Sequence, residues 1–325
     1  MPLDHDVLPT FALVRFRRGP GAAATPGVLS DGRVHPLDLA ALGVASLNDV
    51  FERWDELEAT VRATGRAQDG LALDDVVLTA PVEPRQVLQT GANYRTHVID
   101  LEVGHMAKDD PRPVEEVREA IGRMMDERAA HGQPYFFLGL AQTVVGDDQD
   151  LVLPSYSDKQ DWELELAAII GRTAFRVSRE DALDHIWGWT IINDITTRDR
   201  VFRRDMPAIG TDWYRGKNAP GFNPTGPFAV PRSDAPAPED FQLRLDLNGE
   251  TMQDAGTTDL LFDVPALLSG ASETLPLLPG DLLFTGSPAG NGQARGIFLK
   301  PGDRMTGSIS GLGTQRVTCV AEGAR

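Results

Sequence analysis

The stretch "DWELELAAIIG", residues 161–171, places two glutamates one residue apart at the start of an apolar run. This alternation of apolar and acidic residues predicts a β-strand, because successive side chains of a strand point to opposite faces. Glu163 and Glu165 would then share one face, with their Cα atoms about 6.5 to 7 Å apart. A solvated strand face is the simpler interpretation, since acidic residues are mostly exposed. A cation or a third acid nearby would favour a binding site instead.

A third acid lies in "HIWGWTIINDITTRD", residues 185–199, where the apolar residues indicate a buried strand that Asn193 and Asp194 interrupt. A buried carboxylate must be hydrogen-bonded, neutralised or bound to a cation. The alternative is an ordinary turn, which Asn and Asp favour. If Asp194 meets Glu163 and Glu165, oxygen ligands without cysteine or clustered histidine indicate Mg²⁺ or Mn²⁺, with Ca²⁺ as an alternative. Such a cation keeps open positions for water and for the adjacent oxygens of a 2-oxo carboxylate.

Composition narrows the class of partner. The chain has 325 residues, with 31 Lys and Arg against 48 Asp and Glu, a formal net charge of −17. Such a negative field repels phosphate backbones and anionic lipid, so neither nucleic acid nor a membrane is an expected partner. The N-terminus shows no leader pattern, and no apolar run reaches the length of a membrane span. A single cysteine, Cys319, cannot form an internal disulfide, which is typical of the cytoplasm.

Turn residues and hydrophobic periodicity divide the chain into a small N-terminal α/β module, residues 1–80, and a larger part, residues 81–325. In the module, "FALVRFRR" predicts a strand and "VLSDGRVHPL" a hairpin with Asp-Gly at its turn. "LNDVFERWDELEATVRATG" predicts one amphipathic helix capped by Ser46 or Asn48. The proline-bearing connector "APVEPRQ" marks the boundary.

The larger part is mostly strand-like. One apolar stripe predicts a helix over residues 113–130, and beyond it alternating segments are separated by turns, including Asn-Gly in "FQLRLDLNGETMQ". We find no dinucleotide fingerprint, no P-loop and no G-x-S-x-G elbow. The sequence therefore predicts an α+β protein that is mainly β, with a rolled or sandwiched sheet.

Further candidates for chemistry lie in loops. "GANYRTHVIDLE" supplies His97 with Asp100 and Glu102 close behind it. A histidine hydrogen-bonded to a carboxylate can act as a general base towards water, although a structural histidine is the alternative. Lys217 in "YRGKNAPGFNPTGP" could present its ammonium group to an oxyanion, or be a surface lysine. Ser287 in "FTGSPAG" has glycine neighbours that allow a carboxylate to approach closely.

From residue 82 to the C-terminus the chain resembles the fumarylacetoacetate hydrolase (FAA hydrolase) superfamily. The motifs that carry the resemblance, in the family's order, are "NYRTH", "DWELELAAIIGR", "GWTIINDITTRD", "GKNAPGFNPTGP" and "LLPGDLLFTGSPAG". The resemblance implies a mixed β-sandwich roll, a homodimer and a Mg²⁺ or Mn²⁺ site. The N-terminal module is similar to the smaller, variable domain of the family.

The resemblance also implies roles for individual residues. Lys217 would bind the oxo or enolate oxygen of the substrate, and His97 would activate water with Asp100 or Glu102 as its partner. The implied metal ligands are Glu163, Glu165 and Asp194. The resemblance also implies that Arg198 lines the substrate pocket, and Tyr94 and Ser287 are further candidate substrate-binding residues.

Several positions depart from the family pattern. Asp100 stands where many relatives have glutamate, Gly139 where a lysine is common, Val201 where glutamine is frequent and Ser287 where threonine is common. None of these changes affects an expected metal ligand. They do not indicate which substrate the protein binds.

Together these features predict a divalent-metal-dependent hydrolase. It would cleave a C–C bond in an acylpyruvate-like 1,3-diketo acid, a step of aromatic compound catabolism, through an enolate held by the metal. The alternative is a lyase or isomerase on a 2-oxo acid: a 2-oxo-4-enoate hydratase, a sugar-acid dehydratase or an oxaloacetate decarboxylase. A non-catalytic ligand-binding protein on the same fold is a third interpretation.

Overall fold

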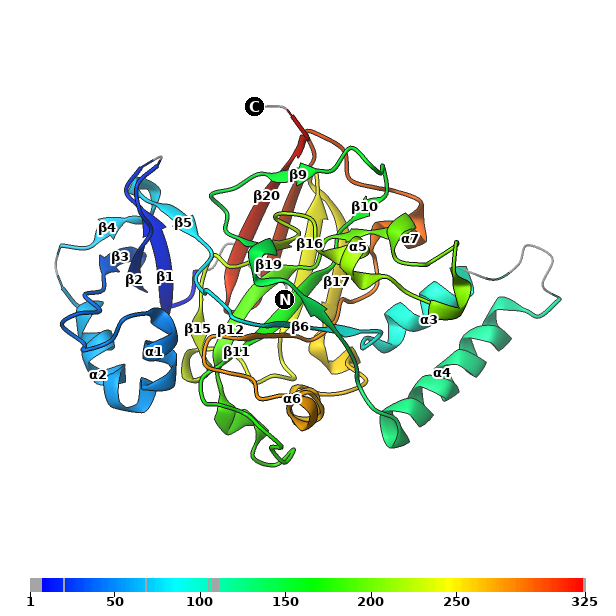
Figure 1. Cartoon of the computed structure of the whole chain (residues 1–325), viewed down its shortest axis with the longest axis horizontal. Coiled ribbons are helices and arrows are strands. Elements are labelled where there is room, and N and C mark those ends of the chain that lie inside the picture. The colour runs from blue at the N-terminus through cyan, green and yellow to red at the C-terminus, as the bar shows by residue number, and fades with distance from the viewer. Residues whose placement is uncertain (1–7, 20, 68, 105, 107–110, 324–325) are drawn as a thin grey trace.

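A computed structural model of the chain describes residues 8–19, 21–67, 69–104, 106 and 111–323. Residues 1–7, in which the sequence predicts no leader, lie outside the described residues. Figure 1 shows the N-terminal sheet with two helices at one end of the molecule, and two further helices, α3 and α4, at the opposite end. No helix among the described residues has both the length and the apolar composition that crossing a bilayer requires.

The first sheet has five strands in the order β4-β3-β2-β1-β5. The strand and the hairpin expected from the sequence are confirmed, and Asp31 and Gly32 form the turn with φ of 49° and 72°. Positive φ at both central residues gives the turn whose twist matches the strands of a hairpin. The strands are β1 Phe11–Arg17, β2 Thr25–Ser30, β3 Arg33–Pro36, β4 Leu71–Ala72 and β5 Val77–Thr79.

The helix predicted after this hairpin is two helices, so the prediction of one continuous helix is wrong. Helix α1 spans Leu47–Glu52 and α2 spans Trp54–Thr64, with a break at Arg53, whose φ and ψ are −101° and 24°. Ser46 and Asp49 form a capping box at the start of α1. The break changes the direction of the chain, which lets aromatic residues from both helices reach the neighbouring sheet.

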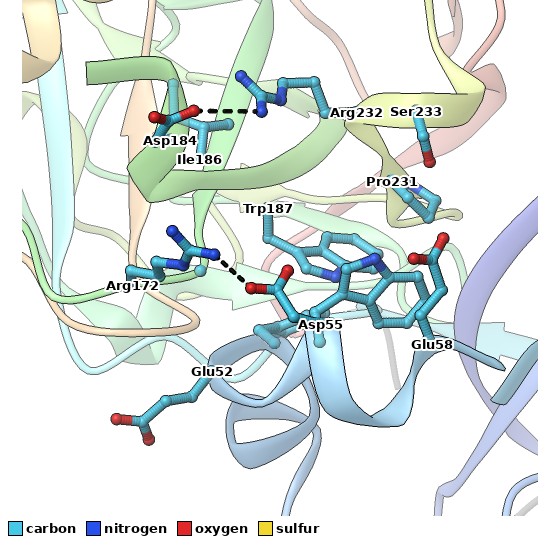
Figure 2. A pocket seen from close by; sticks show the side chains of 13 residues that line it. Glu52, Asp55, Glu58, Arg172, Asp184, Ile186, Trp187, Pro231, Arg232 and Ser233 are labelled. Carbon is cyan, nitrogen blue, oxygen red and sulfur yellow. Dashed lines mark hydrogen bonds and ion pairs between the residues drawn. The ribbon is translucent and has the colours of Figure 1, made fainter. Parts of the chain in front are cut away.

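Two of these aromatic rings pack on Trp187. The ring of Phe51 lies 4.6 Å from that of Trp187, and the ring of Trp54 lies 5.2 Å from it. A cavity of about 190 Å³ lies beside them. Figure 2 shows residues that line it, with Asp55 of α2 paired with Arg172. Buried side chains of the N-terminal sheet and of the central sheet belong to the same apolar cluster. The division of the chain at residue 80 stays a prediction.

The central sheet has six strands in the order β15-β12-β11-β18-β6-β7. Its middle strands β11 and β12 are antiparallel and buried along their whole length, which explains their nearly continuous apolar sequences. The predicted strand at 161–171 begins only at Leu164, so Glu163 lies just before β11. The strands are β6 Val87–Gly91, β7 Tyr135–Gly139, β11 Leu164–Ile170, β12 Ile186–Asn193, β15 Val230–Pro231 and β18 Leu282–Phe284.

A third sheet, in the order β17-β16-β19-β20-β9, packs against the central one. Alternate residues of β16 face inward, and the ring of Phe241 meets that of Trp189 at 5.6 Å. The predicted Asn248-Gly249 turn joins β16 to β17. The strands are β9 Leu151–Leu153, β16 Gln242–Leu247, β17 Glu250–Gly256, β19 Arg304–Ile309 and β20 Gly313–Ala321. Two stacked, mostly antiparallel sheets confirm the α+β, mainly β fold class.

Helix α4 spans Val114–His131, within one residue of the prediction. It packs against α3 at the edge of the molecule, so its apolar stripe is only partly covered: Val117 and Met125 are buried, whereas Met124 is 50% exposed. The remaining helices are α3 Arg95–Gly104, α5 Trp213–Lys217, α6 Val264–Thr274 and α7 Gly292–Arg295. The remaining strands pair as β8 Val144–Val145 with β14 Asn223–Pro224, and β10 Gln160–Asp161 with β13 Thr196–Thr197.

Candidate active site

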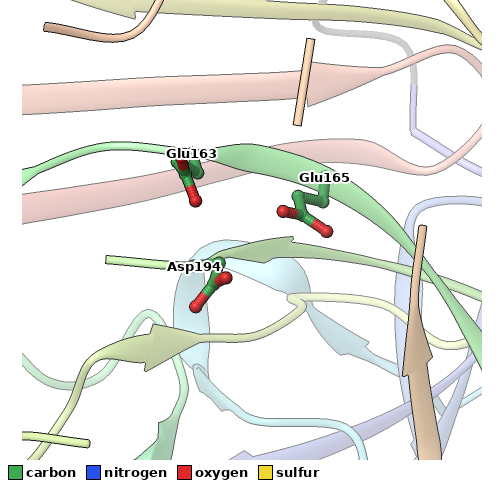
Figure 3. A group of neighbouring side chains, drawn as sticks. All are labelled: Glu163, Glu165 and Asp194. Carbon is green, nitrogen blue, oxygen red and sulfur yellow. The ribbon is translucent and has the colours of Figure 1, made fainter. Parts of the chain in front are cut away.

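Three carboxylates meet at one end of β11 and β12. One ligand oxygen each from Glu163, Glu165 and Asp194 lies within 4.8 Å of the others, and the three residues are 8%, 1% and 1% exposed. Figure 3 shows the three side chains close together on two neighbouring segments of chain. The interpretation as a solvated strand face is wrong, because these acids are buried.

The end of β12 holds these acids in place. Asn193 accepts a hydrogen bond from the backbone N–H of Glu163 through Oδ1 at 2.9 Å. The backbone N–H of Asp194 donates to the carbonyl oxygen of Glu163 at 2.8 Å. Asn193 and Asp194 therefore connect the end of β12 to the start of β11 by hydrogen bonds. This role explains why two polar residues end a buried apolar strand.

Each acid has further partners. Glu165 accepts a 2.7 Å hydrogen bond from the backbone N–H of Gly286, and Asp194 accepts one of 2.7 Å from Nε2 of Gln89. Burial, together with the charges of Asp194 and Glu163, raises the pKa of Glu165 well above its ordinary value. Burial also raises the pKa of Asp194 to about 6, although Lys217 opposes this shift.

Lys217, at the end of α5, lies among these acids. Its Nζ is 2.6 Å from Oε2 of Glu163 and 2.5 Å from Oδ2 of Asp194. Only 1% of the residue is exposed, so the surface-lysine alternative is wrong. Burial opposes the charged form, but Asp194 and Glu163 raise the pKa of Lys217, which keeps the ammonium group charged.

Arg198 adds a second cation and connects the trio to Asp161. Its Nε is 2.7 Å from Oδ2 of Asp161, and its Nη2 is 2.7 Å from Oε1 of Glu163. Asp161 is fully buried and also accepts hydrogen bonds from the backbone N–H groups of Gly292 and Gln293 at 2.6 and 2.9 Å. Sequence reasoning missed Asp161, although its position directly before the acidic strand was a signal.

The trio fits a divalent cation. Carboxylate oxygens are the donors that Mg²⁺ and Mn²⁺ prefer. Burial raises the pKa of both Glu165 and Asp194, and a neighbouring carboxylate adds to each shift, so a bound cation would stabilise their charged forms. Beside Asp194, the buried Oε1 of Gln89 has no hydrogen-bond partner among the described residues. The site therefore has oxygen atoms and negative charge to offer to a cation.

His97 lies on α3 and is 8% exposed. Burial lowers its pKa to about 4, so the imidazole is neutral at pH 7. Its Nε2 is 3.5 Å from Nδ2 of Asn291. Asp100 pairs instead with Arg118 of α4 at 2.8 Å, and Glu102 is exposed. Within the described residues, neither acid is hydrogen-bonded to His97.

The other two expected substrate-binding residues flank Glu165. Tyr94 is fully buried, and its hydroxyl has no hydrogen-bond partner in the described part of the chain. Burial and the charge of Glu165 raise the pKa of this hydroxyl. Ser287 directly follows Gly286, and its Oγ accepts a 2.9 Å hydrogen bond from Nε2 of Gln253. The structure thus brings Tyr94 and Ser287 to the same end of β11 as the acids.

Comparison with known proteins agrees with this geometry. The family model for the C-terminal domain of fumarylacetoacetate (FAA) hydrolase matches residues 86–320. A 2,4-didehydro-3-deoxy-L-rhamnonate hydrolase of Sphingomonas sp. (strain SKA58) is 33% identical over 234 residues, 71% of this chain and 72% of that protein. A mitochondrial oxaloacetate tautomerase of Bos taurus is 30% identical over 308 residues, 93% of this chain and 89% of that protein.

A solved structure supports the same fold. Maleylpyruvate hydrolase from Sphingobium sp. SYK-6, in complex with manganese(II) and pyruvate, aligns with a TM-score of 0.72 and 25% identity. The alignment covers 95% of this chain and 99% of that one.

Proposed function

The chain belongs to the fumarylacetoacetate hydrolase family, whose members are enzymes, and from this membership we propose that it is a divalent-metal-dependent hydrolase of acylpyruvate-like 1,3-diketo acids. One observation carries the proposal: three buried carboxylates, Glu163, Glu165 and Asp194, share one small space with the ammonium group of Lys217. The maleylpyruvate hydrolase of the same fold holds manganese and pyruvate, and pyruvate is the 2-oxo acid that such a cleavage releases.

Glu163, Glu165 and Asp194 would hold Mg²⁺ or Mn²⁺, with Ca²⁺ as an alternative. When bound, the cation supplies Lewis-acid stabilisation of negative charge on the substrate. Lys217 would stabilise the same developing charge through its ammonium group, because it is buried and charged. Arg198, whose side chain is 16% exposed, would bind the substrate's carboxylate. Tyr94 and Ser287 would complete the lining of this pocket.

His97 would act as the general base. Since burial keeps its imidazole neutral at pH 7, its lone pair is available to accept a proton from water. The water oxygen forms a bond to the acyl carbon, and the C–C bond breaks with its electron pair passing to the pyruvate fragment as an enolate. Protonation of that enolate gives pyruvate beside a second carboxylic acid. Asp100 or Glu102 as the partner acid stays a prediction, with Asp100 held by Arg118 in the structure.

We also propose a homodimer in the cytoplasm. Large apolar side chains are exposed on β7 and on the segment from residue 202 to 214, which is typical of an interface. The most exposed of these are Leu138 at 60%, Phe202 at 66%, Ile209 at 59% and Tyr214 at 72%.

The test is turnover of a substrate panel. The purified chain is incubated with MgCl₂ or MnCl₂ and a series of acylpyruvates, maleylpyruvate and oxaloacetate included, while the loss of enol absorbance is followed. NMR then identifies the products, because only hydrolysis releases two acids. The Glu165→Gln variant is the matched control, since it keeps the side-chain size and removes one charge. Absence of turnover by the folded wild-type chain on every substrate would reject the proposal.

A lyase or isomerase on a 2-oxo acid is the second candidate. It is favoured by the oxaloacetate tautomerase that aligns with 93% of the chain. In the same assay a single product with an unchanged carbon count, or carbon dioxide release, would identify this alternative.

A further inference from the structure

A buried asparagine connects the candidate base to a candidate metal ligand. Asn291 directly precedes α7 and is 0% exposed. Its Nδ2 lies 3.3 Å from Oε1 of Glu163 and 3.5 Å from Nε2 of His97. A fully buried amide is costly unless it is hydrogen-bonded, so its position between these two groups needs an explanation.

Local structure does not explain this side chain. Asn291 occupies the N-cap position of α7, but its side chain makes no capping hydrogen bond among the described residues. Its Oδ1 is buried and has no partner there either. Leaving such an acceptor unsatisfied is unfavourable, and no capping hydrogen bond compensates for it. The contacts of Nδ2 with Glu163 and His97 are therefore the remaining explanation for a buried asparagine at this position.

The backbone fixes where this amide stands. A Cβ at Gly290, whose φ is 106°, would lie 2.0 Å from the carbonyl oxygen of Met252. A Cβ at Gly292 would lie 2.0 Å from the carbonyl oxygen of Ile297. The chain is therefore tightly packed on both sides of Asn291, and the side chain is presented from a rigid support.

The orientation of the amide follows from charge. Turning it around would place Oδ1 beside the carboxylate of Glu163, where two acceptors repel each other, so Nδ2 faces Glu163. The same N–H₂ group then faces Nε2 of His97. A donor opposite Nε2 favours the lone pair on that nitrogen and disfavours a proton there.

We propose that Asn291 is a positioning residue that holds His97 in the tautomer protonated on Nδ1, with the lone pair of Nε2 facing the amide group of Asn291. This inference rests on the proposed function, in which His97 takes a proton from water. In the other tautomer Nε2 carries a hydrogen and cannot accept that proton. Asn291 would also keep the base at a fixed separation from Glu163, because one amide group contacts both.

The experiment reads the tautomer directly. Protein labelled with ¹⁵N-histidine is studied by long-range ¹H–¹⁵N correlation NMR at neutral pH, without substrate. The signals of His97, one of six histidines, are assigned from the His97→Gln variant. In the wild type we expect Nδ1 protonated and Nε2 unprotonated. A protonated Nε2 in the wild type would overturn the proposal, whatever the activity of the protein.

Two variants then test the role of the amide. Asn291→Leu keeps the shape and removes the donor, so a mixture of tautomers is expected. Asn291→Asp presents acceptors only, so the Nε2-protonated form should dominate. The remaining histidines serve as internal controls for correct folding. An unchanged His97 spectrum in both folded variants would also overturn the proposal.

Kinetics separates this role from substrate binding. In Asn291→Leu we expect kcat to fall about 10- to 100-fold, as is usual when a supporting hydrogen bond is lost, with KM and the calorimetric affinity for oxalate nearly unchanged. A rise in KM with an unchanged kcat would contradict the positioning role. If the wild type turns over no substrate, the proposed function fails, but the tautomer measurement still decides the role of Asn291.

Discussion

Replacing Lys217 by methionine tests the charge balance of the site. The substitution keeps most of the apolar side chain and removes the ammonium group, whose Nζ lies 2.6 Å from Glu163 and 2.5 Å from Asp194. Both carboxylates are buried, at 8% and 1% exposure. Their charge would then lose its partner in a place that water does not reach, so we expect a loss of stability.

The loss of stability in Lys217→Met should be several kcal/mol. Removing one partner of a buried ion pair costs about 3 to 5 kcal/mol. An unfolding entropy of about 2.1 cal/mol/K per residue gives roughly 0.7 kcal/mol/K for this chain, so the Tm should fall by roughly 4 to 7 °C. Mn²⁺ at about 100 times its Kd adds about 2.7 kcal/mol, or roughly 4 °C, to the wild type. The gain should be larger in Lys217→Met, because the carboxylates lack their cation.

The loss should also depend on pH. The pKa of Asp194 is raised to about 6 in the folded chain, and removal of Lys217 raises it further. An acid whose folded pKa lies above its unfolded value destabilises the folded state as the pH rises through this range. The variant should therefore differ more from the wild type at pH 8 than at pH 5.5, where Asp194 can take up a proton.

Thermal unfolding followed by circular dichroism measures these effects, first in EDTA and then with MnCl₂, at both pH values. Lys300→Met is the matched control, since Lys300 is exposed and the same group is removed. A Tm of Lys217→Met equal to that of the control in EDTA at pH 8 would refute the reasoning. So would a smaller Mn²⁺ gain in the variant than in the wild type.

Two further predictions concern other parts of the molecule. Burial raises the pKa of Asp147 to about 7, so its carboxylate costs stability as the pH rises from 4 to 7. The Asp147→Asn variant should gain about 2 to 4 kcal/mol in urea unfolding at pH 8 and less than about 1 kcal/mol at pH 4. An equal gain at both pH values would contradict this cause. The proposed homodimer predicts twice the chain mass in sedimentation equilibrium, and the double variant Phe202→Glu, Tyr214→Glu should shift the protein to the monomer; a wild type that is monomeric at micromolar concentration would exclude the dimer.

Sequence periodicity predicted the elements that depend on local signals. The strand β1, the hairpins at Asp31-Gly32 and Asn248-Gly249 and helix α4 follow from alternation, turn residues and an apolar stripe. The break at Arg53 was missed, because both helices share one amphipathic pattern and the change of direction depends on packing against Trp187. Local patterns do not contain that tertiary contact.

In the candidate site, too, local patterns predicted some residues and missed those that depend on tertiary contacts. The trio could be predicted because two acids alternate in an apolar strand and a third interrupts another. Asp161, Gln89 and Asn291 were missed, because each is a single polar residue whose partners come from distant segments of the chain. The acids close to His97 in sequence were expected to be its partners, but α4 brings Arg118 to Asp100, a pairing that no local pattern indicates.

The charged side chains of the site do not balance one another. Its buried acids are Asp161, Glu163, Glu165 and Asp194, and its cations are Lys217 and Arg198. Four negative and two positive charges leave a deficit of two, which one divalent ion would cancel and one more lysine would not. Without a divalent ion, bound protons reduce this excess of negative charge, in agreement with the raised pKa values of Glu165 and Asp194. The neutral amides of Gln89 and Asn291 donate hydrogen bonds to Asp194 and Glu163. They satisfy these acids without changing the net charge of the site, as a further charged side chain would.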